Sequence, residues 1–241
     1  MFLQTFETYN SFNERELKNK NVVVIDTLRA TSVITTALYN GAKEIIPVSE
    51  VEEAMELVKN LDKTAYLLGG ERNSMKIEGF DLSNSPLEYT REKVENKTII
   101  FTTTNGTKAL KKVSLADNVI LGCLLNASAI AKYIHNNNKD TIIVCAGTEG
   151  KFSFDDIITA GVIYKKLQDL MDFKSDDLSK ASYFLYKPYE DNLYEIMKHG
   201  YHLKRLEELG YKEDIEFCLT VDKFDIVPKL KDGVIRNSAD L

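Results

Sequence analysis

Five acidic residues lie directly or shortly after apolar stretches of the chain: Asp26, Glu71, Glu149, Asp155 and Asp156. Carboxylate oxygens are the ligands that Mg²⁺ prefers, and because the ion keeps several waters of its own, few carboxylates suffice. We expect four of these residues to bind Mg²⁺: Asp26, Glu71, Glu149 and Asp156. Four are candidate catalytic residues, one of which would be the base that orients a water: Asp26, Glu149, Asp155 and Asp156. The plainer alternative is that Asp26 caps the following helix and that Asp155 and Asp156 only complement a helix dipole.

Groups that bind anions stand beside these acids. Arg29 and Thr31 follow Asp26 in the same loop, and Arg72 follows two glycines, which let the backbone approach a ligand closely. A guanidinium group is a forked donor that matches phosphate or carboxylate. We therefore expect Arg29, Thr31 and Arg72 to bind an anionic substrate, although a surface ion pair is an alternative for Arg72.

Residues 102–108 carry three consecutive threonines, followed by Asn105 and Gly106, where an apolar stretch gives way to a helical pattern. Backbone N–H groups and hydroxyls at such a point face an anion at the positive end of the helix dipole. An ordinary capped helix start explains Asn105 but not three consecutive threonines. We expect four residues of this segment to bind the anion: Thr103, Thr104, Asn105 and Gly106.

The elements that must position these groups follow from hydrophobic periodicity. Short apolar runs predict strands at 22–25, 66–68, 99–101, 119–121 and 142–145. Another at 43–48 would pair within the sheet, with Pro47 marking an edge or a strand end. Helical patterns lie between them, at 30–40, 50–61, 105–113, 126–137 and 155–170, the last three with Asn105, Asn126 and Asp155 as candidate caps. This order predicts a layered α/β/α fold with a mainly parallel sheet, whose strand-end loops would gather the polar residues into one site.

The last third of the chain has a different pattern. Residues 173–212 predict a helical segment packed on or near the site, with helices at 176–187, 190–198 and 202–209. The stretch 217–236 could add a short strand or an ordered tail. We expect residues 1–241 to form a single α/β domain, because this length suffices for one large core.

Composition narrows the setting. With 31 Lys and Arg against 37 Asp and Glu, the net charge of −6 argues against a general nucleic-acid surface. No apolar run approaches the roughly 18 residues that a membrane span needs, and the N-terminus does not resemble a signal peptide. Three cysteines form no evident disulfide framework, so we expect a cytoplasmic protein. Its expected partner is a small anionic phosphoester, not nucleic acid or membrane, and a homodimer is the candidate assembly.

Several familiar mechanisms lack their residues. The glycines of 147–150 are three positions apart where a P-loop has five, and no Gly-x-Ser-x-Gly motif exists. No cysteine is followed six positions later by the arginine that a cysteine-dependent phosphatase requires. His135, His199 and His202 lie outside the strand-end loops, so we expect surface positions for them. Leu28 occupies the place where a haloacid-dehalogenase phosphatase has its second aspartate. Metal-assisted phosphoryl transfer to water is the chemistry best supplied.

Taken together, the motifs over about residues 20–165 resemble those of the 2-phosphosulfolactate phosphatases of coenzyme M biosynthesis. The resemblance is carried by 24–32, 69–72 with 80–86, 102–107, 123–127 and 145–150, followed by Asp155 and Asp156. It implies an α/β, Mg²⁺-dependent hydrolase that releases phosphate from 2-phospho-3-sulfolactate to leave 3-sulfolactate. As part of the matching pattern, Asn84 and Ser85 become candidates for binding substrate. Cys123 and Asn126 are further candidates, and because Cys123 lacks the downstream arginine that would stabilise a thiolate, we expect it to be a wall of the pocket and not a nucleophile. From its own position, Asn126 is better explained as a helix cap than as a site residue.

Two other functions stay open at this point. One is a phosphatase that acts on a different small multi-anionic phosphoester. The other is a sensor domain that binds a small anion at the same strand ends. Clustered carboxylates count against the sensor, because they repel an anion unless a cation intervenes.

Overall fold

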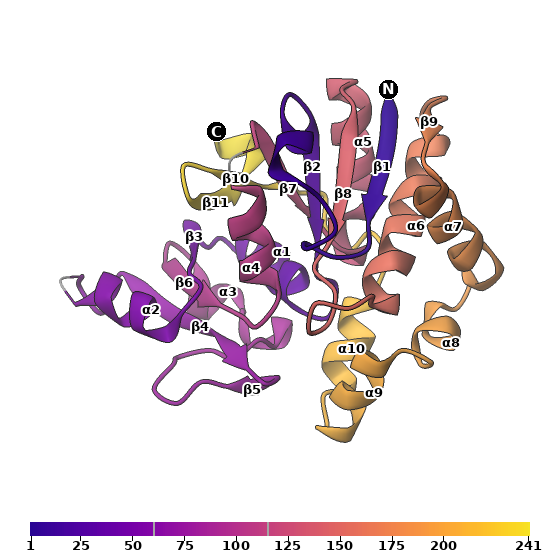
Figure 1. Ribbon diagram of the computed structural model, residues 1–241. Helices are drawn as coiled ribbons and strands as arrows, with labels where there is room; N and C mark the ends of the chain where they lie inside the picture. Colours follow the sequence, from indigo (N-terminus) through magenta and orange to yellow (C-terminus); the bar gives the residue numbers. More distant parts are fainter. Residues whose placement is uncertain (60, 115) are drawn as a thin grey trace.

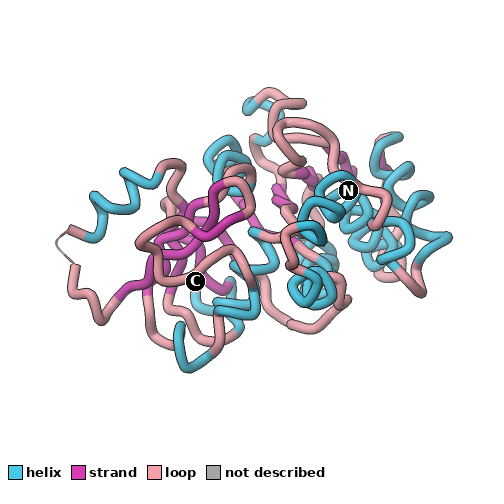
Figure 2. Tube along the Cα trace, turned by 90° about the horizontal axis from the view of Figure 1, so that it is seen from below, coloured by secondary structure: helices cyan, strands magenta, loops and turns pink. Residues whose placement is uncertain are grey.

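The computed structural model describes residues 1–59, 61–114 and 116–241, which form an α/β fold with helices on both faces of a mostly parallel sheet (Figures 1 and 2). The described strands join in one eleven-stranded sheet, in the order β5-β4-β6-β3-β11-β10-β7-β2-β8-β1-β9. This confirms the predicted layered α/β/α class. Strands from both ends of the chain enter the same sheet, since β1 (Phe2–Phe6) and β10 (Pro228–Lys231) are both part of it.

One group of parallel strands forms half of the sheet. Its members are β1, β2 (Asn21–Ile25), β7 (Asn118–Gly122), β8 (Thr141–Cys145) and the short β9 (Lys174–Ser175). In β2, Val22 and Val24 face one hydrophobic cluster while Val23 and Ile25 face another. All five residues of β2 are buried, as expected for a central strand covered on both faces.

A second parallel group forms the other half. It comprises β3 (Glu44–Pro47), β4 (Tyr66–Arg72) and β6 (Thr98–Thr102), with β5 (Met75–Lys76) pairing antiparallel to the end of β4. Pro47 is the last residue of β3, as one of the two expectations had it. The edge position is wrong, because β3 lies between β6 and β11.

An antiparallel hairpin of β10 and β11 (Val234–Asn237) joins the two halves. Because β10 is antiparallel to β7 and β11 is antiparallel to β3, the two parallel groups run in opposite senses along the ladder. Sheet twist of about 20–25° per strand accumulates to roughly 100–125° over the five steps from β6 to β2. Because of this twist, the strands of the two groups are no longer exactly antiparallel. The loops that follow the strands of both groups can therefore line one cavity.

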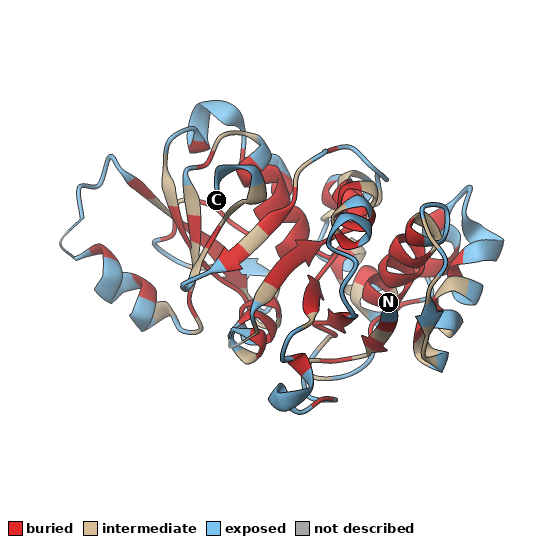
Figure 3. Ribbon diagram, turned by 90° about the horizontal axis from the view of Figure 1, so that it is seen from above, coloured by how far each residue is buried: buried red, intermediate tan, exposed pale blue. Residues whose placement is uncertain are grey.

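Helices cover both faces, with buried residues concentrated where strands and helices meet (Figure 3). The cluster on one face of β2 includes residues of α1 (Ala30–Tyr39) and α4 (Gly106–Val113). The cluster on the opposite face includes residues of α5 (Ala127–Asn137) and α6 (Phe154–Gln168). In the second half, α2 (Val51–Val58) packs on β4 and β6, and α3 (Arg91–Val94) precedes β6. Residue 60, inside the predicted helix 50–61, is not among the described residues.

The C-terminal third is helical up to residue 218, and most of it packs on the cluster that also contains α5 and α6. Its helices are α7 (Asp177–Tyr186), α8 (Leu193–Met197), α9 (Tyr201–Glu208) and α10 (Lys212–Cys218). The stretch 217–236, expected to add a short strand or an ordered tail, contributes strands from Pro228 onward. Its first two residues belong to α10. Single turns of 3-10 helix occur at Glu14–Leu17, Pro86–Glu88, Leu124–Asn126, Lys187–Tyr189 and Ser238–Asp240. No helix in the described part of the chain is long and apolar enough to cross a membrane.

Candidate active site

A small cavity, about 40 Å³ in volume, lies where loops of the two strand groups meet. Its lining comes from the loops after β2, β4, β6 and β8, from Asn84, and from α9. Loops from both halves of the sheet therefore converge, as the sequence predicted for the strand ends. The contribution of α9 places part of the segment 173–212 beside this cavity.

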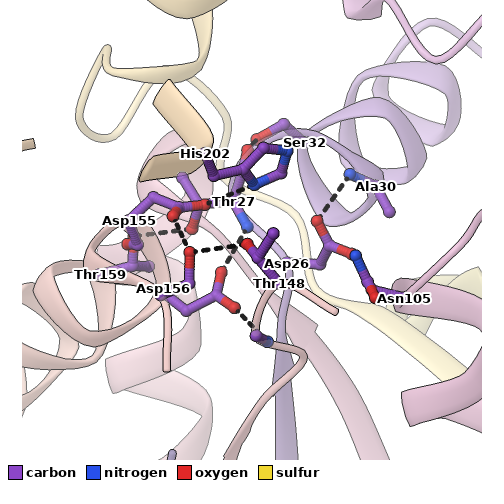
Figure 4. Close-up of polar contacts among 12 residues, drawn as sticks. Asp26, Thr27, Ala30, Ser32, Asn105, Thr148, Asp155, Asp156, Thr159 and His202 are labelled. Atoms are coloured by element: carbon purple, nitrogen blue, oxygen red, sulfur yellow. Dashed lines mark hydrogen bonds and ion pairs between the residues drawn. The ribbon is translucent and has the colours of Figure 1, made fainter. Parts of the chain in front are cut away.

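Asp26 is the buried acid of the cavity. It follows β2 directly, and its Oδ1 accepts a hydrogen bond from the Ala30 amide at 3.2 Å (Figure 4). Gly106, at the first turn of α4, packs closely against it: a Cβ on Gly106 would lie 2.7 Å from Asp26 Oδ2. Burial, and then the nearby Asp155 carboxylate, raise the pKa of Asp26 to about 7. Near neutral pH this carboxyl group can therefore both hold and release a proton.

Asp155 and His202 form a second polar pair next to Asp26. Asp155 accepts a hydrogen bond from the Ser153 hydroxyl. His202 Nδ1 lies 3.8 Å from Asp155 Oδ2 (Figure 4). Burial lowers the pKa of His202, so the imidazole is neutral at pH 7. The expected surface position for His202 is wrong, because α9 turns this residue into the cavity. Ser153, and not Asp155, stands at the N-cap position of α6.

Asp156 and Glu71 hold loops in place through backbone N–H groups. Asp156 accepts from the amides of Thr27 at 3.0 Å and Gly147 at 2.9 Å, which ties the loop after β2 to the loop after β8. Glu71 accepts from the amides of Ser74 and Thr104, both at 2.6 Å. Burial, and then Asp155, raise the pKa of Asp156 well above its ordinary value. Each of these carboxylates already accepts two backbone hydrogen bonds, so its oxygens are less available to bind a metal ion.

Glu149 stands apart from the other acids. Its side chain is 58% exposed and pairs with Arg205 Nη1 at 3.1 Å. It lines the cavity on the solvent side, and its contact is a cation. The structure therefore does not bring Glu149 into a carboxylate cluster with Asp26.

The arrangement of carboxylates bears on the expected Mg²⁺. Of the residues described, no group of three or more His, Cys, Asp or Glu side chains is arranged to hold a metal ion by itself. Mg²⁺ is commonly held by one or two carboxylates together with waters and substrate phosphate. Asp26 and Asp155 fit that smaller requirement, because they repel each other and the side chain of each accepts only one hydrogen bond from the described residues. A divalent cation between them would offset the cost of burying both charges.

Arg29 is the buried cation of the cavity, and it is rigidly held. Its side chain donates to Asp214 Oδ2, on α10, and to the carbonyl of Ser74 at 3.2 Å. Its guanidinium carbon lies 4.0 Å from the centre of the Tyr211 ring. Ser85, predicted to bind substrate, instead donates its hydroxyl to Asp214 Oδ1 at 2.6 Å. The guanidinium is thus fixed on several sides beside Asp26.

Arg72 and Thr31 do not line the cavity. Arg72 donates to the carbonyl of Ser49 at 2.8 Å and to the hydroxyl of Thr102 at 2.9 Å, which fastens β4 to neighbouring segments. Thr31 donates its hydroxyl to the carbonyl of Asp26 at 2.8 Å and shapes the turn into α1. The side chains of both residues make hydrogen bonds within the protein and do not face the cavity.

Two polar atoms of the cavity have no partner within the protein. Among the described residues, the buried side-chain oxygens that lack a hydrogen bond are Asn84 Oδ1 and Thr104 Oγ1, and both residues line the cavity. A buried polar atom without a partner costs about 1–3 kcal/mol. Such atoms are explained if a polar ligand supplies the missing hydrogen bonds.

In the loop before α4, some polar groups already form hydrogen bonds within the protein. The amide of Thr104 donates to Glu71, and the amide of Thr107 donates to Thr103 Oγ1 at 3.2 Å. Asn105 occupies the N-cap position of α4 without a side-chain capping bond, and its Oδ1 accepts from the Glu149 amide at 3.3 Å. Thr103, Thr104 and Asn105 line the cavity, as predicted.

Cys123 and Asn126 lie away from the cavity. Cys123 is fully buried and belongs to a small cluster with Leu125 and Phe224, where desolvation raises the pKa of its thiol. The Asn126 side chain accepts from the Cys123 amide at 2.9 Å and donates to the carbonyls of Leu121 and Ile226, both at 3.2 Å. The Asn126 side chain therefore stabilises the backbone around it, and Cys123 is part of the core.

Three residues of the site were not identified from the sequence: His202, Arg205 and Asp214. His202 and Arg205 are three positions apart on α9 and share the helix face turned to the cavity. This spacing was visible, but nothing local shows which face of a short helix meets a site formed by distant loops. The cavity therefore combines an acid that can accept a proton, Asp26, with a fixed cation, Arg29, and a partly exposed one, Arg205.

The chain is similar along nearly its whole length to a known protein family. A sequence model of the family described as 2-phosphosulpholactate phosphatase matches residues 6–233. A protein of Caldanaerobacter subterraneus subsp. tengcongensis named probable 2-phosphosulfolactate phosphatase is 79% identical over 240 residues, which cover 100% of both chains. Proteins of the same name from Clostridium tetani and Caldicellulosiruptor saccharolyticus are each 48% identical, over 94% and 98% of this chain and 96% and 99% of their own.

Proposed function

Because the chain belongs to the 2-phosphosulfolactate phosphatase family, we propose that it hydrolyses 2-phospho-3-sulfolactate to 3-sulfolactate and phosphate with the aid of Mg²⁺. Membership confirms the resemblance seen in the motifs. The observation that carries the proposal is the cavity itself, in which Asp26 and Arg29 lie beside two polar atoms without partners, with the Asp155 carboxylate close enough to raise the pKa of Asp26.

The substrate carries three anionic groups, and the cavity has matching donors. Arg29 would bind the phosphoryl group, since its guanidinium is held near Asp26. The Thr104 hydroxyl would donate to a substrate oxygen, whereas Asn84 Oδ1 is an acceptor and would take a hydrogen bond from a water in the cavity. The amides of Asn105 and Gly106 remain the backbone donors that we expect to help at the start of α4.

Asp26 and Asp155 would hold the Mg²⁺, which when bound would neutralise phosphoryl charge and make a water more acidic. His202 is neutral at pH 7 and would accept the proton from the attacking water. Asp155, with Oδ2 3.8 Å from His202 Nδ1, would stabilise the imidazolium that forms. Asp156 keeps the loops after β2 and β8 together, so that Asp26 and Asp155 stay in register.

The proposed setting is a reducing cytoplasm and the biosynthesis of coenzyme M, the pathway that the resemblance implies. The three cysteines are free and buried, which is compatible with such a compartment. A sensor domain accounts less well for the site, because it needs no pair of buried acids beside its anion.

Phosphate release from 2-phospho-3-sulfolactate tests the proposal. We expect turnover with Mg²⁺, none in excess chelator, and recovery when Mg²⁺ is restored. Asp26→Asn, purified in the same way, is the control for contaminating phosphatases and should lose at least about two orders of magnitude in rate. Full activity in chelator would contradict the metal mechanism, and binding of the substrate without turnover would favour the sensor.

A further inference from the structure

Arg205 is a cation of the cavity with no part yet in the proposed reaction. It projects from α9 beside His202, while Leu203 and Leu206, each 1% exposed, anchor the helix in the core. The side chain of Arg205 is 29% exposed, whereas that of the buried Arg29 is 1% exposed. Arg205 therefore stands on the solvent side of the cavity, where a part of the substrate remote from Asp26 would lie.

The partner of Arg205 is the carboxylate of Glu149, at 3.1 Å. A carboxylate on this guanidinium presents the same kind of anionic oxygens that a carboxylate or sulfonate of a small substrate would present. Both side chains are partly exposed, at 29% for Arg205 and 58% for Glu149, so water screens the pair and it contributes little to the stability of the fold. A substrate anion can therefore displace Glu149 at small cost.

The backbone at Glu149 is unfavourable for a glutamate. Thr148 and Lys151 exchange both of their backbone hydrogen bonds, at 2.9 and 3.0 Å, around a two-residue turn of Glu149 and Gly150. Both turn residues have positive φ, 54° and 74°, a turn type that favours Asn-Gly. A glutamate is held here against its backbone preference, and its side chain makes the contact with Arg205.

We propose that Arg205 binds one of the two non-reacting anionic groups of the substrate, the sulfonate or the carboxylate, and that Glu149 occupies Arg205 until the substrate arrives. The inference rests on the proposed phosphatase function and adds to it the residue that distinguishes multi-anionic substrates from simple phosphomonoesters. Arg29 serves the reacting phosphoryl group in this scheme, and Arg205 serves the far end of the molecule.

Steady-state kinetics on four compounds test the proposal: 2-phospho-3-sulfolactate, 2-phospholactate, 2-sulfoethyl phosphate and ethyl phosphate. The second compound lacks the sulfonate, the third lacks the carboxylate, and the fourth lacks both. For Arg205→Gln we expect KM for the full substrate to rise about 10- to 100-fold with kcat within about threefold, since the contact exists in both ground and transition states. Arg205→Lys should recover only part of the loss, because lysine keeps the charge without the planar fork.

The compounds decide which anion is bound. A loss shared by the full substrate and 2-sulfoethyl phosphate alone assigns the sulfonate to Arg205, and a loss shared with 2-phospholactate alone assigns the carboxylate. Lys204→Gln removes the same charge from the neighbouring exposed position of α9 and should leave every KM unchanged. An equal loss on all four compounds, ethyl phosphate included, would overturn the proposal.

Glu149 is tested by two substitutions. Glu149→Gln keeps the size of the side chain and Glu149→Asn suits the turn better, and both remove the competing charge. Both should lower KM for the full substrate about two- to fivefold without changing KM for ethyl phosphate. A rise in KM would contradict the placeholder role. If the wild-type enzyme does not turn over 2-phospho-3-sulfolactate, the proposed function fails; calorimetric binding of 3-sulfolactate to wild type, Arg205→Gln and Lys204→Gln still decides the role of Arg205.

Discussion

At the scale of single residues, the site depends on acids that the fold buries at unequal cost. Asp156 and Glu71 are each compensated by two backbone amides. Asp26 accepts one weaker bond, at 3.2 Å; burial, and then the Asp155 carboxylate, raise its pKa to about 7. Asp26, which lines the cavity and has a raised pKa, thus has the environment expected of a functional group.

The raised pKa of Asp26 predicts a pH-dependent stability in the metal-free protein. Its ordinary value is 3.8, so between pH 4 and 7 the folded protein holds a proton that the unfolded chain has lost. The contribution to the free energy of unfolding is fully present below about pH 4 and is lost as pH rises through 7. Asp26→Asn keeps an acceptor for the Ala30 amide and carries no charge. In chelator at pH 8, calorimetry should show this variant melting about 5–10 °C above wild type, with little difference at pH 4; equal melting at both values would refute the assignment.

At the scale of elements, the site depends on close contact between α1 and α4. A Cβ on Gly106 would lie 2.7 Å from both Ala30 Cβ and Asp26 Oδ2, so the two helix starts touch through a residue without a side chain. Asp26 directly follows β2, a strand of the first parallel group. It is thus positioned by α4, the helix that follows β6 of the second group. Any larger residue at position 106 must move α4 or the carboxylate.

Gly106→Ala should therefore lower kcat by about 10- to 100-fold, because a displacement near 1 Å at a reacting group has effects of that order. Gly122→Ala is the matched control: its Cβ would meet Val23 Cγ1 at 3.0 Å and Ile163 Cδ1 at 3.2 Å, in the core and not at the cavity. Both variants should lose about 1–3 kcal/mol of stability from overpacking. Thermal denaturation and steady-state rates separate the two effects, and an unchanged kcat in Gly106→Ala would show that the contact does not position Asp26.

At the scale of the whole molecule, the cavity exists because the β10–β11 hairpin joins two strand groups. Ile235 on β11 is fully buried and pairs with Ile45 of β3, while β10 pairs with β7 through Lys229 and Leu230. The hairpin is therefore the only connection, among the described strands, by which the two halves share one sheet. Residues near the end of the chain thus support a site built mainly from its first two thirds.

Ile235→Ala should lower the free energy of unfolding by about 2–5 kcal/mol through the cavity it leaves. We also expect kcat/KM to fall well below the melting temperature, because the two halves that line the site are less firmly joined. Ile130→Ala, fully buried on α5 within one half, is the control with a comparable stability loss and should keep its kcat/KM. Equal kcat/KM in the two variants would indicate that the hairpin supports stability alone.

The sequence by itself determined the features that depend on neighbouring residues. Hydrophobic periodicity located the central strands and helices, because burial on one or both faces leaves a local pattern. Polar loops after apolar runs identified Asp26, Arg29, Thr103, Thr104 and Asn105, and all of these line the cavity. The motifs, taken together, identified the family.

Only the tertiary structure decided how similar side chains divide their roles. Arg29 and Arg72 look alike in sequence, yet one lines the cavity and the other binds Ser49 and Thr102. Arg205 enters from a helix whose orientation depends on core contacts far away in the chain. Two of the acids each accept one hydrogen bond from a loop distant in sequence, Asp156 from the Thr27 amide and Glu71 from the Thr104 amide, so which carboxylates remain free depends partly on non-local hydrogen bonding. Periodicity reports what a residue is next to along the chain, whereas charge compensation and access to the cavity depend on what folding brings near it in space.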